Sequence, residues 1–168
     1  MGQTIIYMRH AEYHRTMGSN SGTLTERGKE MALDMGLFMY SREFNPDVCI
    51  FSNAIRAKET KDLVLQAYQG KDDYDFSKLI QFEEKSINET WDLDPFVDVI
   101  ALFPEAKCIL IVGHNPAIGA LAGMLTSTTS VFTPGSFIAV EYPSEITMET
   151  ICNRHITKVL LEERALYF

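Results

Sequence analysis

Short apolar runs that alternate with helical patterns constrain the fold more than any other feature of this sequence. The first run, residues 4–8, has no polar alternation, as expected of a strand buried on both faces of a sheet. The other runs are residues 48–51, 79–82 and 108–112, and a segment with helical spacing of apolar residues follows each of the four. Two further strand-like runs, 136–142 and 157–162, have no helix between them. This order predicts an α/β protein, a three-layer α/β/α sandwich with a mainly parallel sheet.

Residues with helix-capping ability mark the starts of the predicted helices. Thr25 or Thr23 can cap the helix that follows the first strand. Asp94-Pro95 and Asn115-Pro116 each place a capping residue before a proline, which is favoured in the first turn of a helix. We therefore expect one helix to begin at Asp94, ahead of the strand at 108–112, and another to begin at Asn115, just after it.

Length, charge and cysteine content narrow the class of protein. The 168 residues suit one domain of roughly 150 residues, so we expect a single domain over residues 1–168. A net charge of −8 disfavours binding to nucleic acid or to an anionic membrane surface. The apolar stretches are shorter than the roughly 20 residues of a membrane span, and we expect Cys49, Cys108 and Cys152 to be buried, reduced thiols. These features predict a cytoplasmic protein without nucleic-acid or membrane partners.

Charged and imidazole side chains follow the ends of the predicted strands. Ligands of open parallel sheets bind beyond the carboxyl ends of the strands, so these side chains are candidates for one site. Guanidinium groups bind phosphoryl groups through two parallel hydrogen bonds, and an acidic protein needs a local cationic pocket to hold such an anion. In chain order the candidates are Arg9, His10, Arg56, Glu83, Glu84 and His114.

Each candidate also has an ordinary structural interpretation. A lone histidine after a strand is more often a capped loop residue, and Arg56 can pair with Glu59 or Asp62 on a helix surface. The joint placement of two histidines and two arginines at corresponding strand ends favours the functional interpretation. A metal site built from His10, His14 and His114 is disfavoured, because no metal-ligand spacing is present and the neighbouring arginines repel a cation.

Four short motifs lie at these strand ends and helix starts. Residues 8–12 are MRHAE, residues 24–28 are LTERG, residues 52–60 are SNAIRAKET and residues 112–116 are VGHNP. In type and order they resemble the motifs of the histidine phosphatase superfamily. The stretch TPGSFIAVEY at 133–142 is similar to that of the small SixA-type phosphohistidine phosphatases. The resemblance covers nearly the whole chain and implies a phosphoglycerate mutase-like fold.

The resemblance also implies a mechanism. It assigns His10 as a nucleophile that forms a covalent phosphohistidine, with Arg9, Arg56 and His114 around the phosphoryl group and no cofactor. Physical chemistry supports the same roles, because a neutral imidazole can attack phosphorus while cationic groups neutralise the charge on the equatorial oxygens. We expect the pKa values of His10 and His114 to be pushed apart, with bound phosphate favouring the protonated form of His114.

The sequence departs from the family pattern at two points. Ala11 occupies the glycine position of the RHG signature, which adds a Cβ beside the expected phosphate and disfavours a positive φ. The proton donor that larger members place after the third strand has no unambiguous match. Glu84 lies best at the strand end and ranks slightly ahead of Glu89, which lies in the segment SINET.

These observations predict a phosphatase that forms a phosphohistidine intermediate and acts on phosphohistidine in a protein. The absence of long insertions after the second and third strands favours an open site that a protein loop can reach. Alternatives are a phosphatase or mutase for small phosphate esters, and a mutase needs its intermediate shielded from water. A binding module that captures a phosphorylated partner without turnover is disfavoured by the presence of both Arg9 and His10.

Overall fold

The computed structural model describes residues 2–16, 18, 20–127 and 132–165 and has the predicted α/β architecture. The strands are β1 (Gln3–Arg9), β2 (Val48–Phe51), β3 (Ile80–Glu83), β4 (Cys108–Gly113), β5 (Phe137–Tyr142) and β6 (Lys158–Glu163). The α-helices are α1 (Glu26–Ser41), α2 (Ile55–Leu65), α3 (Asp94–Ile100) and α4 (Ala117–Thr126), and short 3-10 helices are η1 (Gln66–Tyr68), η2 (Phe76–Lys78) and η3 (Lys85–Ile87).

The six strands form one mixed sheet in the order β3-β2-β4-β1-β5-β6. β1 is parallel to β4, and β2 is parallel to both β3 and β4, so the four strands that alternate with helices form a parallel block. β5 runs antiparallel to β1 and β6, as expected for two strands with no helix between them. The prediction of a mainly parallel sheet is confirmed, and the carboxyl ends of β1 to β4 share one edge.

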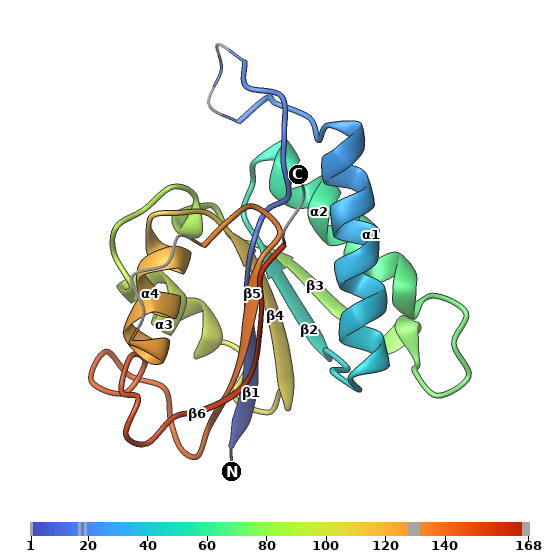
Figure 1. Ribbon diagram of the computed structural model, residues 1–168. Helices are drawn as coiled ribbons and strands as arrows, with labels where there is room; N and C mark the ends of the chain where they lie inside the picture. The colour runs from blue at the N-terminus through green and yellow to red at the C-terminus, as the bar shows by residue number, and fades with distance from the viewer. Residues whose placement is uncertain (1, 17, 19, 128–131, 166–168) are drawn as a thin grey trace.

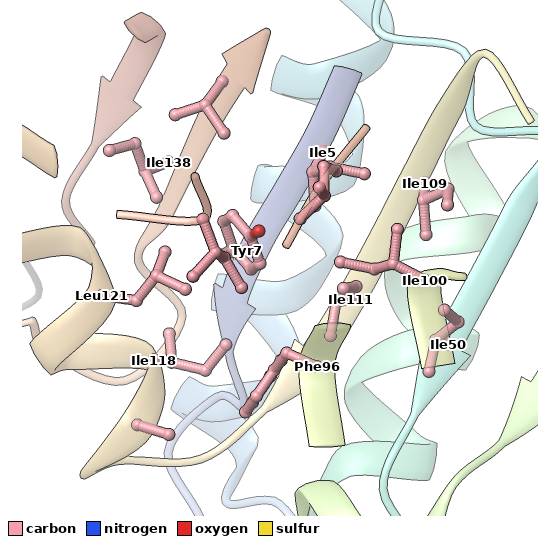
Figure 2. Close-up of a cluster of buried hydrophobic side chains, with 14 of the residues drawn as sticks. Ile5, Tyr7, Ile50, Phe96, Ile100, Ile109, Ile111, Ile118, Leu121 and Ile138 are labelled. Carbon is pink, nitrogen blue, oxygen red and sulfur yellow. The ribbon is translucent and has the colours of Figure 1, made fainter. Parts of the chain in front are cut away.

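Helices cover both faces of the sheet: α1 and α2 lie on one face and α3 and α4 on the other (Figure 1). Successive residues of β1 alternate between the two cores, with Ile5 facing α3 and α4 and Ile6 facing α1 and α2. Figure 2 shows the first of these cores, in which Tyr7 of β1 lies near Phe96 of α3 and Ile118 of α4. Burial on both faces is the physical reason for the continuous apolar runs.

The third strand differs from the other parallel strands. β3 lies at the edge of the sheet and most of its side chains are exposed, including Ile80. It begins at Ile80 and extends to Glu83, whereas the sequence pattern predicts residues 79–82. An edge strand pairs on one side only, which explains why its apolar signal is weak and its boundary shifts by one residue.

Two of the three predicted helix starts need correction. Thr25 caps α1 as predicted, and its hydroxyl accepts a hydrogen bond from the Gly28 amide. Asp94 lies inside the first turn of α3, because Leu93 packs against the core and already has helical backbone angles. α4 begins at Ala117, although the Asn115 side chain accepts a hydrogen bond from the Gly119 amide and so still caps the first turn.

Other expectations concern the cysteines and membrane spans. Cys49, Cys108 and Cys152 are all free, and the first two are buried whereas Cys152 is half-buried. Within the described ranges, none of the helices combines the length and apolar composition needed to cross a bilayer.

Candidate active site

His10 follows the last residue of β1 and is almost completely buried. Its backbone amide donates to the carbonyl of Gly113 at the end of β4, over 3.0 Å, which fixes the residue between two strand ends. Its ring nitrogen Nδ1 lies 2.8 Å from the carbonyl oxygen of Ala11. Because a carbonyl can only accept, Nδ1 carries the hydrogen and Nε2 has a free lone pair. This is the tautomer that a nucleophilic imidazole needs.

The surroundings of His10 keep its imidazole neutral. Burial lowers its pKa to about 3, and the nearby guanidiniums of Arg9 and Arg56 act in the same direction, while the hydrogen bond to Ala11 opposes them. The ring of His10 is therefore unprotonated near neutral pH, when its lone pair is available.

His114 follows β4 and lies beside His10, with ring centroids 5.0 Å apart. Its Nδ1 accepts a hydrogen bond from Nη2 of Arg56 over 3.2 Å. Its Nε2 therefore carries the hydrogen and donates it to the hydroxyl of Ser52, which follows β2. His114 thus links the ends of β2 and β4 and the start of α2.

The expectation that the pKa values of His10 and His114 are pushed apart is not met. Burial lowers the pKa of His114 to about 2, with further lowering by His10, Arg56 and Arg9. The same burial and the same two guanidiniums act on both rings, so both pKa values move in one direction. A neutral His114 is consistent with its acceptance of a hydrogen bond from Arg56.

Arg56 lies in the first turn of α2 and is fully buried. Its Nη2 forms an ion pair with the carboxylate of Glu89 over 2.5 Å and also donates to His114. The alternative of surface pairing is wrong: Glu59 instead accepts from the Leu24 amide, and Asp62 pairs with its neighbouring lysine. A buried guanidinium at a strand edge is costly unless an anion compensates it.

Arg9, the last residue of β1, adds a second guanidinium at this edge. Its Nη1 donates to the carbonyl of Phe132 over 2.9 Å, and its Nε is buried without a hydrogen-bond partner among the described residues. Burial lowers the pKa of Arg9, and the positive charges of Arg15 and Arg56 lower it further, although Tyr13 opposes them. Arg9 therefore lies in a positive environment to which Arg15 and Arg56 both contribute. Arg15 was not among the site residues predicted from the sequence.

The two candidate acids have different surroundings. The carboxylate of Glu84 accepts from the amide and hydroxyl of Ser86 and so caps η3. In the described part of the chain, no hydrogen bond or ion pair joins Glu84 to Arg9, His10, Arg56 or His114. Glu89 has a left-handed backbone, φ 43°, and its half-exposed carboxylate contacts Arg56. The structure therefore joins Glu89 to Arg56, whereas Glu84 contacts Ser86.

Ala11 does not tighten the site as expected from the sequence. Its side chain is buried in the core beneath α1 and α2, and its amide donates to the hydroxyl of Thr60 over 3.0 Å. Its φ is not positive, so the backbone at this position does not require glycine. The Cβ of Ala11 contributes to packing on the face of the sheet that α1 and α2 cover.

Sequence reasoning missed Tyr13 and Ser52, both of which contact the histidines. The ring of Tyr13 is perpendicular to that of His10, with centroids 5.2 Å apart, and Ser52 hydrogen-bonds His114. Ser52 is the first residue of the motif at 52–60 and directly follows β2, and both features point to a site residue. By contrast, His14 and His155 are exposed, and the described residues include no group of three or more His, Cys, Asp or Glu side chains that could hold a metal ion.

This arrangement of two buried histidines and two arginines lies on a fold that is shared with known phosphatases. The chain has the predicted phosphoglycerate mutase-like fold, an α/β/α sandwich with a mainly parallel sheet. The protein histidine phosphatase SixA in complex with tungstate matches with a TM-score of 0.73 and 17% identity, covering 96% of this chain and 97% of that one.

Phosphatases with other substrates match nearly as well. The α-ribazole phosphatase from Shigella flexneri has a TM-score of 0.66 and 16% identity, with 99% of each chain covered. The mycobacterial glucosyl-3-phosphoglycerate phosphatase has a TM-score of 0.65 and 12% identity, covering 98% of this chain and 100% of that one. No family model and no curated protein matches the sequence. At these identities the likeness establishes the fold.

Proposed function

We propose that this chain is a phosphatase that forms a covalent phosphohistidine on His10, and that its substrate is phosphohistidine in a protein. The observation that carries the proposal is the 2.8 Å contact between Nδ1 of His10 and the Ala11 carbonyl oxygen, which selects the tautomer of His10. A hydrogen on Nδ1, bound to the Ala11 carbonyl, leaves Nε2 as a lone-pair nucleophile in a neutral ring. Arg9 and Arg56 supply donors and positive charge around that nucleophile, and His114 accepts a hydrogen bond from Arg56.

The first step transfers the phosphoryl group to His10. Nε2 attacks phosphorus, a nitrogen–phosphorus bond forms, and the bond from phosphorus to the leaving group breaks with its electron pair. Arg9 and Arg56 stabilise the charge on the three equatorial oxygens. In the second step, water attacks phosphorus, His10 leaves with the electron pair of the nitrogen–phosphorus bond, and phosphate is released.

His114 contributes through its change of protonation. Its neutral ring donates one hydrogen to Ser52 and accepts one from Arg56. A phosphoryl dianion beside the ring favours the cation, because opposite charges stabilise the charged form of a titratable group. In that form Nδ1 becomes a donor, and the hydrogen bond from Arg56 is replaced by one toward the phosphoryl oxygens.

A second candidate function is hydrolysis of small phosphate monoesters, and Glu89 favours it. An alkoxide is a strong base and needs a proton from a general acid as it leaves. Glu89 is the carboxyl group that contacts Arg56, and half of its side chain is exposed, which makes it the candidate proton donor to a leaving oxygen.

Access to the site supports a protein substrate. The connection from β2 to α2 is only residues 52–54, and that from β3 to α3 is residues 84–93, so neither builds a long lid. The imidazole rings of His10 and His114 are buried. A phosphoryl group at the end of a long side chain, such as the imidazole of a phosphohistidine, is therefore favoured. Trp91, in the second connection and two residues from Glu89, is 80% exposed, and exposed aromatic residues are common in protein-binding surfaces.

The substrate class is tested by comparing kcat/KM for a phosphohistidine peptide, the same peptide carrying phosphoserine, and a sugar phosphate. We expect the phosphohistidine peptide to be hydrolysed most efficiently, with inactivity of His10→Ala on all three. A higher kcat/KM for the sugar phosphate would support the second candidate. Failure to hydrolyse any of the three would contradict both.

A further inference from the structure

Tyr13 contacts two members of the candidate site at once. Its ring is perpendicular to that of His10, at 87° and 5.2 Å between centroids. The guanidinium carbon of Arg56 lies 4.6 Å from the centroid of the same tyrosine ring. One aromatic side chain therefore packs against both the nucleophile and the buried arginine, two groups that come from different elements.

The backbone around Tyr13 holds the ring in this place. Tyr13 forms an isolated antiparallel bridge with Leu24, and the neighbouring His14 amide donates to the carbonyl of Thr23. A Cβ on Gly22 would lie 2.7 Å from Cδ2 of Tyr13, so only a residue without a side chain leaves room for the ring. The position of Tyr13 is thus fixed by a short β-like pairing of the segment that follows β1 with the segment before α1.

We infer that Tyr13 is a positioning residue for phosphoryl transfer: its ring fixes the orientation of the His10 imidazole and of the Arg56 guanidinium, and it keeps water from His10. The inference rests on the proposed phosphatase function. Tyr13 acts through two groups and takes no part in the bonds that form or break. Its side chain lies three residues beyond His10, at a position that none of the four motifs includes.

The aromatic ring, and not the hydroxyl group, carries this role. The hydroxyl of Tyr13 makes no hydrogen bond with any residue that the structure describes. Phenylalanine keeps the face that attracts the Arg56 cation and the perpendicular ring contact with His10. Leucine fills part of the same space but has neither the flat shape nor the negative face of the ring.

Removal of the ring changes the titration of His10 in a defined direction. The charged and titratable groups that act on His10 are Arg9 of β1, Arg56 of α2 and His114 beyond β4, and all three remain in a Tyr13 variant. Water that replaces the ring stabilises the imidazolium form, because burial is the largest cause of the lowered pKa of His10. The pKa of His10 then rises toward its usual value, and less of the enzyme is active in mildly acidic solution.

The kinetic test compares Tyr13→Phe, Tyr13→Leu and Tyr13→Ala, with Tyr40→Leu as a matched control on α1. We expect Tyr13→Phe to keep kcat within about twofold on a phosphohistidine peptide and on p-nitrophenyl phosphate. Tyr13→Leu should lower kcat about tenfold with a smaller change in KM, while Tyr40→Leu keeps its kcat. Wild-type kcat in Tyr13→Leu, or an equal loss in Tyr13→Phe, would overturn the inference.

A titration without substrate tests the same inference independently of turnover. The C2 proton signals of the four histidines are followed by NMR from pH 8 to pH 5, with His10→Ala used to assign His10. In the wild type and in Tyr13→Phe the signal of His10 should not titrate above pH 5, whereas in Tyr13→Ala it should titrate near pH 6. An unchanged signal in Tyr13→Ala would overturn the role of the ring. A wild type that hydrolyses none of the phosphorylated compounds would instead contradict the proposed function, and the titration would still decide on Tyr13.

Discussion

The ring centroids of His10 and His114 lie 5.0 Å apart, and the two neutral imidazoles carry their hydrogens on different ring nitrogens. His10 has its hydrogen on Nδ1, bound to the Ala11 carbonyl, whereas His114 has its hydrogen on Nε2, bound to Ser52. The first ring therefore offers Nε2 for attack, and the second offers Nδ1 to Arg56. Two residues of one type have different chemical roles because their hydrogen-bond partners select different tautomers.

Replacement of Arg56 by lysine should impair catalysis severely. Lysine keeps the charge but loses the planar fork that contacts Glu89, His114 and Tyr13. A loss of about 2 to 4 kcal/mol of transition-state stabilisation corresponds to a roughly 30- to 900-fold decrease in kcat/KM. Arg27→Lys, at a partly exposed ion pair, is the control and should keep its activity. Near-normal kcat/KM in Arg56→Lys would show that the forked donors are not required.

Replacement of Glu89 by glutamine should separate the two substrate classes. An ester needs a proton on its leaving oxygen, so we expect its hydrolysis to fall about 10²- to 10⁴-fold. The imidazole of phosphohistidine leaves more readily, so its hydrolysis should fall much less. Glu84→Gln, which changes only the charge of a side chain that caps η3, should affect neither rate. Equal losses on both substrates in Glu89→Gln would make Glu89 a general acid for both, and no loss on either would exclude it as the proton donor.

The two buried histidines should make the protein less stable as the pH falls below about 6.5. Their pKa values, about 3 for His10 and about 2 for His114, lie below the value of about 6.5 expected in the unfolded chain. As pH falls below about 6.5 the unfolded chain takes up protons that the folded protein does not, so each ring costs about 2 kcal/mol of unfolding free energy at pH 5. Above pH 7 both states are neutral and the effect vanishes.

Urea unfolding at pH 7 and pH 5 measures this effect. His114→Ala should lose about 2 kcal/mol less than the wild type between the two pH values. Identical pH dependence of wild type and His114→Ala would mean that the folded protein protonates this ring as easily as the unfolded chain does.

Vanadate and sulfate should inhibit to different extents. Vanadate adopts the five-coordinate geometry of a phosphoryl-transfer transition state, whereas sulfate resembles only the ground state, so vanadate should bind more tightly. EDTA should leave the activity unchanged, because the proposed chemistry uses only side chains. Inhibition constants measured on one substrate compare vanadate with sulfate, and equal constants would contradict the first expectation. Activity that EDTA removes and a divalent cation restores would contradict the expectation that EDTA has no effect.

The sequence predicts the parts of the fold and site that depend on strand order. β2 begins and ends at the predicted residues because both of its faces are buried, whereas β3, at the edge, is shifted by one residue. Arg9 and His114 converge because parallel β1 and β4 end at one edge, which alternating strands and helices imply. Such placement follows from backbone topology, and local patterns reveal it.

Features that depend on loop conformation or packing were not predictable in the same way. Glu89 lies in an irregular connection and has a left-handed backbone, and its carboxylate contacts Arg56. The spacing of apolar residues does not predict such a conformation. Tyr13 contacts the site through a bridge to Leu24 that brings together residues from two sides of a loop. The neutral state of His114 depends on its burial among groups distant in sequence, so the sequence did not reveal that its pKa is lowered together with that of His10.

The proposed function depends on a covalent bond between phosphorus and Nε2 of His10. The most direct measurement is to mix the protein with a radiolabelled phosphodonor, quench in alkali, where phosphohistidine survives, and locate the label by peptide mapping. We predict that the label is on the peptide that contains His10, is lost in acid, and is absent from His10→Ala, which also lacks turnover. Label on another residue, or wild-type turnover by His10→Ala, would contradict the account.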